Sequence, residues 1–221
     1  MTKRLALIHT VTSLVGPFNT LCAELIPDAD VFHIADESLI QNVIREGKMS
    51  TMTARRVVRY MISAEEAGAD LMMVTCSSIG DTVAMGQPLL HVPVYRVDQP
   101  MADQAVGMAK RVGVAATLPT TLDPTARLIQ ARASASGKRV EVISQLCEGA
   151  FDAVIAGDAA THDALVREGL REIMNEVDVI VLAQASMARV VETLPEHERR
   201  VPVLSSPRLA VEFLARIIAS M

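Results

Sequence analysis

Aromatic residues are scarce in this sequence of 221 residues, which contains no tryptophan, two tyrosines and four phenylalanines. A surface that stacks nucleic-acid bases needs more aromatic side chains than these. The formal net charge is −5, and lysine and arginine form no run, so a basic face for the phosphate backbone is missing too. These absences exclude the usual modes of nucleic-acid binding.

Membrane segments, metal motifs and cofactor loops are missing as well. No stretch approaches the roughly 18 uninterrupted apolar residues that a membrane helix requires, and Met1–Thr10 is too short for a signal peptide and has no cleavage site. We therefore expect a cytoplasmic protein with no membrane partner. The three cysteines stand at unrelated spacings, which predicts reduced thiols. Because there is no glycine-rich phosphate loop and no lysine at a strand end, we expect no cofactor and no metal.

The most informative feature that is present is an internal repeat with an offset of about 107 to 110 residues. Three pairs of segments match: Arg4–Thr10 with Arg111–Thr117, Asp70–Ser78 with Asp178–Ser186, and Val92–Val94 with Val201–Val203. A duplicated half-sized unit predicts two lobes of roughly 100 residues, each with its own core. We expect residues 1–98 and 208–221 to form the N-terminal lobe and residues 99–207 to form the C-terminal lobe.

Short runs of valine, isoleucine and leucine alternate with helical patterns in both halves, which is typical of βαβ units. We expect strands at Leu5–His9, Asp30–Ile34, Leu71–Val74, Val92–Val97, Val112–Ala115, Val140–Ser144, Val179–Leu182 and Val201–Leu204. Helices are expected at Thr51–Ala67 and Thr161–Glu176, each introduced by a Ser or Thr N-cap, and at Gln99–Arg111 and Arg208–Met221. The predicted fold class is α/β, with two pseudo-symmetric βαβ lobes, four-stranded mainly parallel sheets and a cleft between the lobes.

Ligands of open parallel sheets bind beyond the carboxyl ends of the strands, where this sequence is rich in small hydroxylic residues. Such residues at helix N-termini suit a carboxylate, although each of them alone can equally be an N-cap. Cys76 lies at a strand end and at the apparent start of a helix, so we expect a lowered pKa and a role as nucleophile or general base. Cys22 and Cys147 are expected to be buried apolar residues. Gln184 takes the position of Cys76 in the second half and offers no thiol.

Three strand-end motifs, together with the paired lobes, resemble the aspartate/glutamate/hydantoin racemase superfamily, whose relatives include arylmalonate decarboxylases and maleate isomerases. The motifs are Val74-Thr75-Cys76-Ser77-Ser78, Ala116-Thr117-Leu118-Pro119-Thr120-Thr121 and Leu182-Ala183-Gln184-Ala185-Ser186-Met187. The resemblance covers nearly the whole chain and implies cofactor-independent proton transfer beside a carboxylate of a small acid. It matches Cys76 to the first of the two family cysteines. It assigns contacts to substrate carboxylates to Thr10, Ser13, Ser77, Ser78, Thr117, Thr120, Thr121, Ala185 and Ser186.

Gln184 replaces the second cysteine of that superfamily, and this replacement leaves the reaction open. Two-base racemisation needs a proton carrier on each face of the substrate, whereas racemase- or isomerase-type chemistry with Cys76 alone, or decarboxylation of a substituted malonate, needs only one. Gln184 would then donate a hydrogen bond to a substrate oxygen. A catalytically inactive protein that binds a small acid is the alternative from another class. The chain also permits a homodimer.

His9 stands at the end of the first expected strand and is a candidate second proton carrier. A hydrogen-bonded structural histidine is the other interpretation. Asp98 is expected either to cap the helix that begins at Gln99 or to reach the cleft, and Asp81 and Arg96 are similar cases.

Overall fold

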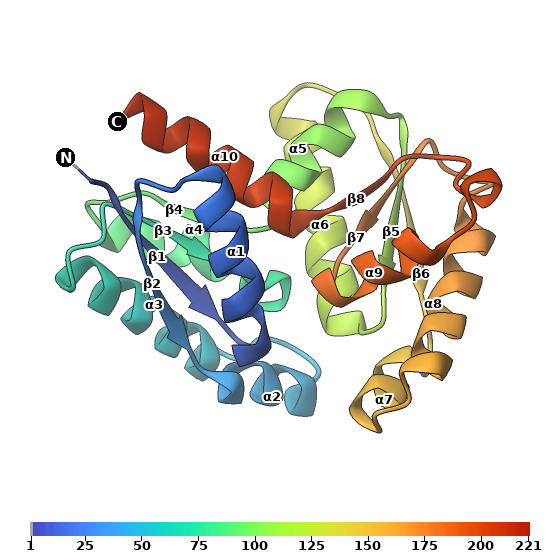
Figure 1. The fold of residues 1–221 in the computed structure, drawn as a ribbon, viewed down its shortest axis with the longest axis horizontal. Helices are drawn as coiled ribbons and strands as arrows, with labels where there is room; N and C mark the ends of the chain where they lie inside the picture. The colour runs from blue at the N-terminus through green and yellow to red at the C-terminus, as the bar shows by residue number, and fades with distance from the viewer. Residues whose placement is uncertain (1) are drawn as a thin grey trace. The chain divides into compact units, whose positions relative to one another are not determined.

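A computed structural model describes residues 2–221, and the chain divides into two compact units (Figure 1). One unit contains the chain up to Gln99 together with Pro207–Met221, and the other contains Pro100–Ser206. Each unit has its own four-stranded sheet and its own helices. Within residues 2–221, no helix is both long enough and apolar enough to span a membrane.

The sheet of the first unit is entirely parallel, with the strand order β2-β1-β3-β4. Its strands are β1 (Arg4–His9), β2 (Asp30–Ala35), β3 (Leu71–Val74) and β4 (Val94–Arg96). The two central strands, β1 and β3, pair in register from Leu5 opposite Leu71 to Ile8 opposite Val74. Both are apolar and buried, as parallel strands covered on two faces must be.

Helices cover both faces of this sheet, because alternate residues of a strand point to opposite sides. Ala6 and Ile8 pack with α2 (Glu37–Glu46) and α3 (Thr51–Glu66), next to the short α4 (Thr82–Gly86). Leu5 and Leu7 pack with α1 (Val15–Leu25) and α10 (Ser206–Ser220) on the other face. Helix α10, the last helix of the chain, and strand β1, the first strand, therefore share one hydrophobic core.

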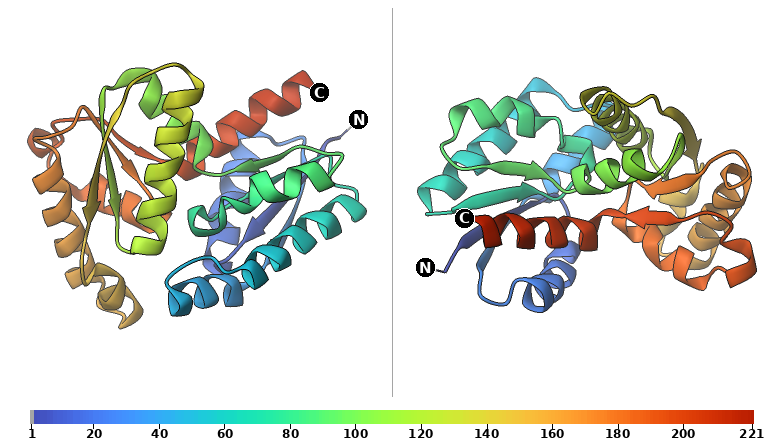
Figure 2. Two further views of the ribbon diagram at one scale, coloured as in Figure 1. Left: turned by 180° about the vertical axis from the view of Figure 1, so that it is seen from behind. Right: turned by 90° about the horizontal axis from the view of Figure 1, so that it is seen from above.

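The second unit repeats this plan with the order β6-β5-β7-β8, again entirely parallel. Its strands are β5 (Arg111–Ala116), β6 (Glu141–Leu146), β7 (Val179–Leu182) and β8 (Val203–Ser205). Its helices are α5 (Gln99–Met108), α6 (Pro119–Ala135), α7 (Ala150–Ile155), α8 (Ala159–Ile173) and α9 (Ala188–Thr193). Residues of α7, α8 and α9 share one apolar core, and α6 lies against the opposite face of the sheet (Figure 2). The predicted α/β fold with two parallel four-stranded sheets is confirmed.

Several predicted ends of helices and strands are corrected. Helix α5 ends at Met108, because Arg111 already begins strand β5. Helix α3 has its expected cap, since the Ser50 side chain accepts a hydrogen bond from the Thr53 N–H at 3.3 Å. Helix α8 instead starts at Ala159, and its cap is Asp158, which accepts from the Thr161 N–H at 3.0 Å. An Asp can cap a helix as well as Ser or Thr, so the prediction of Thr161 was wrong by one turn.

Candidate functional site

The carboxyl ends of β1 and β3 bring several of the candidate residues of the first unit to one edge of its sheet. His9 ends β1 and is followed by the buried Thr10, while Thr75 and Cys76 follow β3. Because β1 and β3 are parallel neighbours, these residues lie side by side. Ser77 and Ser78 are buried in the turn η2 (Ser77–Ile79), whereas Ser13 is exposed in the turn η1 (Thr12–Leu14).

The Cys76 residue is partly buried, and its thiol accepts hydrogen bonds from neighbouring hydroxyl and backbone N–H groups. Burial raises the pKa of this thiol, and hydrogen bonds from the Thr10 hydroxyl, the backbone N–H groups of Ser78 and Ile79, and the Ser78 hydroxyl lower it only in part. The predicted lowering of the pKa was therefore wrong. The turn that follows Cys76 has three residues, too short for a helix dipole that would outweigh burial. Cys76 is thus a neutral thiol near pH 7.

The other two cysteines are buried in apolar cores, as predicted. Cys22 packs with Leu5 and Phe18, and Cys147 packs with Val166 and other residues of the second core. Burial raises the pKa of each thiol to about 11. Cys76 is therefore the most exposed of the three cysteine residues, although its thiol is buried, and it is the one with hydroxyl neighbours.

His9 is fully buried within a chain of polar side chains. Its Nδ1 lies 2.8 Å from the Thr75 hydroxyl, its Nε2 lies 2.9 Å from Nδ1 of His33, and Nε2 of His33 lies 2.8 Å from Oδ1 of Asn19. Burial, with His33 as a smaller cause, lowers the pKa of His9 to about 4, so its ring is neutral near pH 7. The Thr75 hydroxyl also donates to the Ile8 carbonyl at 3.0 Å, so the donor and acceptor roles along this chain depend on the tautomers of the two rings. The role of His9 as a second proton carrier stays a prediction, and both of its ring nitrogens already have hydrogen-bond partners in Thr75 and His33.

A buried ion cluster adjoins the turn that follows Cys76. Arg96, at the end of β4, donates from Nε and Nη2 to the two carboxylate oxygens of Asp98, each at 2.9 Å, and from Nη1 to Asp81 at 2.7 Å. Asp98 is completely buried, and Arg96 is nearly so. The sequence singled out these three residues but gave no sign that they form one cluster.

In the second unit, Gln184 and Thr117 are hydrogen-bonded to each other just beyond the ends of β7 and β5. The Gln184 Oε1 accepts from the Thr117 N–H at 2.6 Å and from its hydroxyl at 3.1 Å, while Gln184 Nε2 lies 2.8 Å from the same hydroxyl. The side chain of Gln184 therefore has a fixed orientation. Thr120 and Thr121 lie in the first turn of α6, and Ala185 and Ser186 lie in the turn η4 (Ala185–Met187). The Thr120 hydroxyl oxygen is buried and has no hydrogen-bond partner within the described part of the chain.

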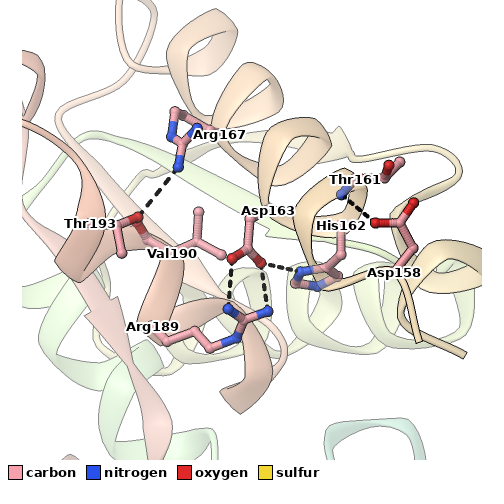
Figure 3. A network of polar contacts seen from close by, with 8 residues as sticks. All are labelled: Asp158, Thr161, His162, Asp163, Arg167, Arg189, Val190 and Thr193. Atoms are coloured by element: carbon pink, nitrogen blue, oxygen red, sulfur yellow. Dashed lines mark hydrogen bonds and ion pairs between the residues drawn. The ribbon is translucent and has the colours of Figure 1, made fainter.

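Helix α9, which follows the Gln184 turn, is attached to α8 by a polar network (Figure 3). Both terminal nitrogens of Arg189 donate to the carboxylate of Asp163 at 2.6 Å, and Nδ1 of His162 lies 2.8 Å from the same carboxylate. His162 itself is almost completely buried. This network fixes the segment after Gln184, and the sequence gave no signal for it. No group of three His, Cys, Asp or Glu residues among residues 2–221 is arranged to hold a metal ion.

Comparisons with known proteins agree with this geometry. The family model described as Asp/Glu/Hydantoin racemase matches residues 8–214. None of the curated proteins matches the sequence.

Solved structures of low sequence identity share the fold. Glutamate racemase isoform RacE1 from Bacillus anthracis has 18% identity and a TM-score of 0.76, over 99% of this chain and 82% of that chain. A putative Asp/Glu racemase from Yersinia pestis has 15% identity and a TM-score of 0.77, over 99% and 100%. Allantoin racemase from Klebsiella pneumoniae has 19% identity and a TM-score of 0.71, over 99% and 89%.

Proposed function

The chain belongs to the Asp/Glu/hydantoin racemase family, and from this premise we propose that it is a cofactor-independent racemase-type enzyme acting on a small carboxylic acid. Cys76 is the proposed proton carrier at the carbon beside a carboxylate. The observation that carries the proposal is the environment of Cys76, where Thr10, Ser78 and Ile79 direct hydrogen bonds at the thiol of the most exposed of the three cysteine residues. These donors stabilise a thiolate whenever the proton leaves the sulfur.

The proposed reaction has two steps. The Cys76 thiolate removes the proton beside the carboxylate, so that the C–H electron pair becomes an enolate-like charge on the substrate and the sulfur becomes a thiol. A proton from solvent is then delivered to the opposite face of the same carbon, which inverts its configuration, and the Cys76 thiol releases its proton to solvent. Because the resting group is a neutral thiol, Cys76 must first lose its proton before it can act as the base.

The proposed contacts to substrate carboxylates are hydroxyl and backbone N–H groups. In the first unit they are Thr10, Ser13, Ser77 and Ser78, and in the second unit Thr117, Thr120, Thr121, Ala185 and Ser186. The buried, unpartnered hydroxyl of Thr120 supports this role, because a buried donor that lacks a partner costs free energy until a ligand supplies one. Gln184 is proposed to face the developing charge with its amide group, which Thr117 holds in place.

Decarboxylation of a substituted malonate is a second candidate, which two observations favour. The raised pKa of Cys76 makes it a proton donor near pH 7, and Gln184 in place of a second cysteine leaves one thiol just after the two strands β3 and β7. In this reaction the bond to the departing carboxylate breaks, CO2 leaves, and the remaining enediolate takes the proton of the Cys76 thiol. The thiol is then restored from solvent.

The test is a proton-NMR experiment in D2O with a panel of amino acids, hydroxy acids, substituted malonates and maleate. We expect deuterium uptake, isomerisation or loss of CO2 with the wild-type protein and none with Cys76→Ala. Cys147→Ala is the matched control, since it removes a buried thiol from an apolar core, and it should retain activity. Activity that survives Cys76→Ala would refute the proposed role. Silence of the folded wild-type protein across the panel would favour a protein that only binds a small acid.

A further inference from the structure

Arg96 is held rigidly at the end of β4. Its guanidinium forms a bidentate salt bridge with the buried carboxylate of Asp98, and its third nitrogen donates to Asp81. The side chain of Arg96 is 10% exposed and that of Asp98 is 0% exposed. A planar guanidinium that is fixed in this way by two carboxylates has little freedom to rotate.

The guanidinium also lies against the backbone of Gly80. A Cβ atom built on Gly80 would meet Cζ and Nε of Arg96 at 2.6 Å and Nη2 at 2.7 Å. The backbone of Gly80 has φ −59° and ψ −32°, which any residue can adopt. Glycine is therefore required here by the close approach of Arg96 and not by the backbone conformation.

Gly80 and Asp81 belong to the same tight turn as the donors around the Cys76 thiol. The Gly80 N–H donates to the carbonyl of Ser77 at 3.0 Å, and the Thr82 hydroxyl donates to the carbonyl of Ile79 at 2.5 Å. At the other end of the segment, the Thr75 N–H donates to Ile8 of β1 at 3.0 Å. The position of the Ser78 and Ile79 N–H groups is thus fixed between strand β3 and the contact with Arg96.

We propose that Arg96 is a positioning residue for Cys76. By binding Asp81 and packing against the backbone of Gly80, it keeps the Ser78 and Ile79 N–H groups directed at the sulfur. This inference rests on the proposed function for its catalytic meaning, although its effect on the thiol does not. The proposed action is through the turn, because three of the five N–H donors of Arg96 already bond to carboxylates and its side chain is only 10% exposed.

The internal repeat supports a function specific to the thiol-bearing unit. Arg96 lies opposite Val74 at the end of β3, and the corresponding residue opposite Leu182 at the end of β7 is Ser205. Asp81 stands five residues after Cys76, and the residue five positions after Gln184 is Arg189, which pairs with Asp163 on a helix instead. The ion cluster on the turn is therefore found in the half with the cysteine and replaced in the half with the glutamine.

The test measures the alkylation rate of Cys76 by iodoacetamide as a function of pH, with the modified peptide quantified by mass spectrometry. Gly80→Ala should push the turn away from Arg96 and weaken at least one hydrogen bond to the thiolate. We expect the apparent pKa of Cys76 to rise by about one unit and alkylation below that pKa to slow about tenfold. Gly107→Ala is the matched control, because a Cβ there has nothing within 4 Å, and it should leave the profile unchanged.

Two further variants separate positioning from general stability. Asp81→Asn removes the exposed carboxylate of the cluster and should shift the profile in the same direction as Gly80→Ala. Arg96→Lys keeps the charge but not the planar fork, and in combination with Gly80→Ala it should add less than the sum of the single shifts. An unchanged profile in folded Gly80→Ala or Asp81→Asn, or fully additive shifts, would overturn the inference. If Arg96→Lys fails to fold, the two milder variants decide.

The thiol titration needs no turnover, so it separates this inference from the proposed function. If the profile moves as expected while no substrate reacts, the positioning role holds and the proposed reaction fails. If substrates react but the profile is the same in all variants, the reaction holds and the positioning role fails.

Discussion

Acidification should destabilise this protein because His9 is buried in its neutral form. His9 is 0% exposed, and burial with a smaller contribution from His33 lowers its pKa from 6.5 to about 4. In the unfolded chain the imidazole takes up a proton below about pH 6.5, whereas the folded protein resists that proton until about pH 4. The contribution of His9 to stability is therefore complete above pH 6.5 and is lost as the pH falls towards 4.

The size of the effect follows from these two pKa values. The difference between 6.5 and about 4, at about 1.36 kcal/mol for each pH unit, gives a maximum loss of about 3 kcal/mol. Between pH 7 and pH 5 the loss is about 2 kcal/mol, because the unfolded histidine is then almost fully protonated and the folded one is not. Protonation would also make both ring nitrogens of His9 donors, so one of its two hydrogen bonds, to Thr75 or to His33, would have to reverse or break.

Urea unfolding followed by circular dichroism at pH 7 and pH 5 measures this contribution. We expect the pH dependence of the stability of His9→Gln to be about 2 kcal/mol smaller than that of the wild-type protein, even if its stability at pH 7 is lower. His197→Gln removes an exposed histidine and should retain the wild-type pH dependence. Equal pH dependence in wild type and His9→Gln would refute the assignment of a neutral, buried His9.

The remaining predictions concern Cys76 and Gln184. If Cys76 acts as a base, kcat/KM should rise with pH towards the raised pKa of the thiol. If Cys76 acts as a proton donor, kcat/KM should be constant near neutral pH and fall above that pKa. The pH profile of deuterium exchange or of decarboxylation distinguishes the two roles. Gln184→Cys should supply a second thiol at the position that the repeat aligns with Cys76 and increase racemase activity, and loss of all activity in this variant would count against the alignment. Thr117→Val should cost about 1 kcal/mol of unfolding free energy and lower kcat, because Gln184 loses a partner that orients its amide, and it should also raise KM, because Thr117 is a proposed contact to a substrate carboxylate; an unchanged kcat would contradict the orienting role.

The strands and the duplication could be predicted from the sequence because apolar runs leave few alternatives. Leu71–Val74 and Val179–Leu182 are observed with the predicted ends, since each run directly follows an aspartate and is buried on both faces. Helix α6 was not predicted, because Thr117–Thr121 reads as a turn and Pro124 disfavours a helix interior. The structure accommodates Pro124 in the second turn of a long helix that packs against β5 and β6.

The pKa of the candidate thiol and the hydrogen-bond partners of the candidate residues could not be predicted from the sequence. Strand ends identify Cys76 and Gln184, but the balance between burial and hydrogen bonds at the thiol depends on how deeply the turn is packed. The partners of His9 and Arg96 come from neighbouring strands and helices, so residue spacing alone cannot pair them. The pKa of Cys76 and the ion cluster beside it are therefore properties of the folded unit.

The two halves of the chain illustrate how a duplicated fold can retain its backbone while its polar turns diverge. The central strands pair in equivalent registers, Leu5 with Leu71 and Val112 with Val179, because the buried ladders and apolar faces tolerate little change. The turns beyond those strands keep a buried apolar residue at the equivalent position, Ile79 and Met187, whereas the residue that opens each turn differs, Cys76 in one half and Gln184 in the other. The first half has the Cys76 thiol and a turn bonded to Arg96 through Asp81, and the second half has the Gln184 amide, which Thr117 holds in place. The proposed reaction assigns the mobile proton to Cys76 and a fixed hydrogen-bonding group to Gln184.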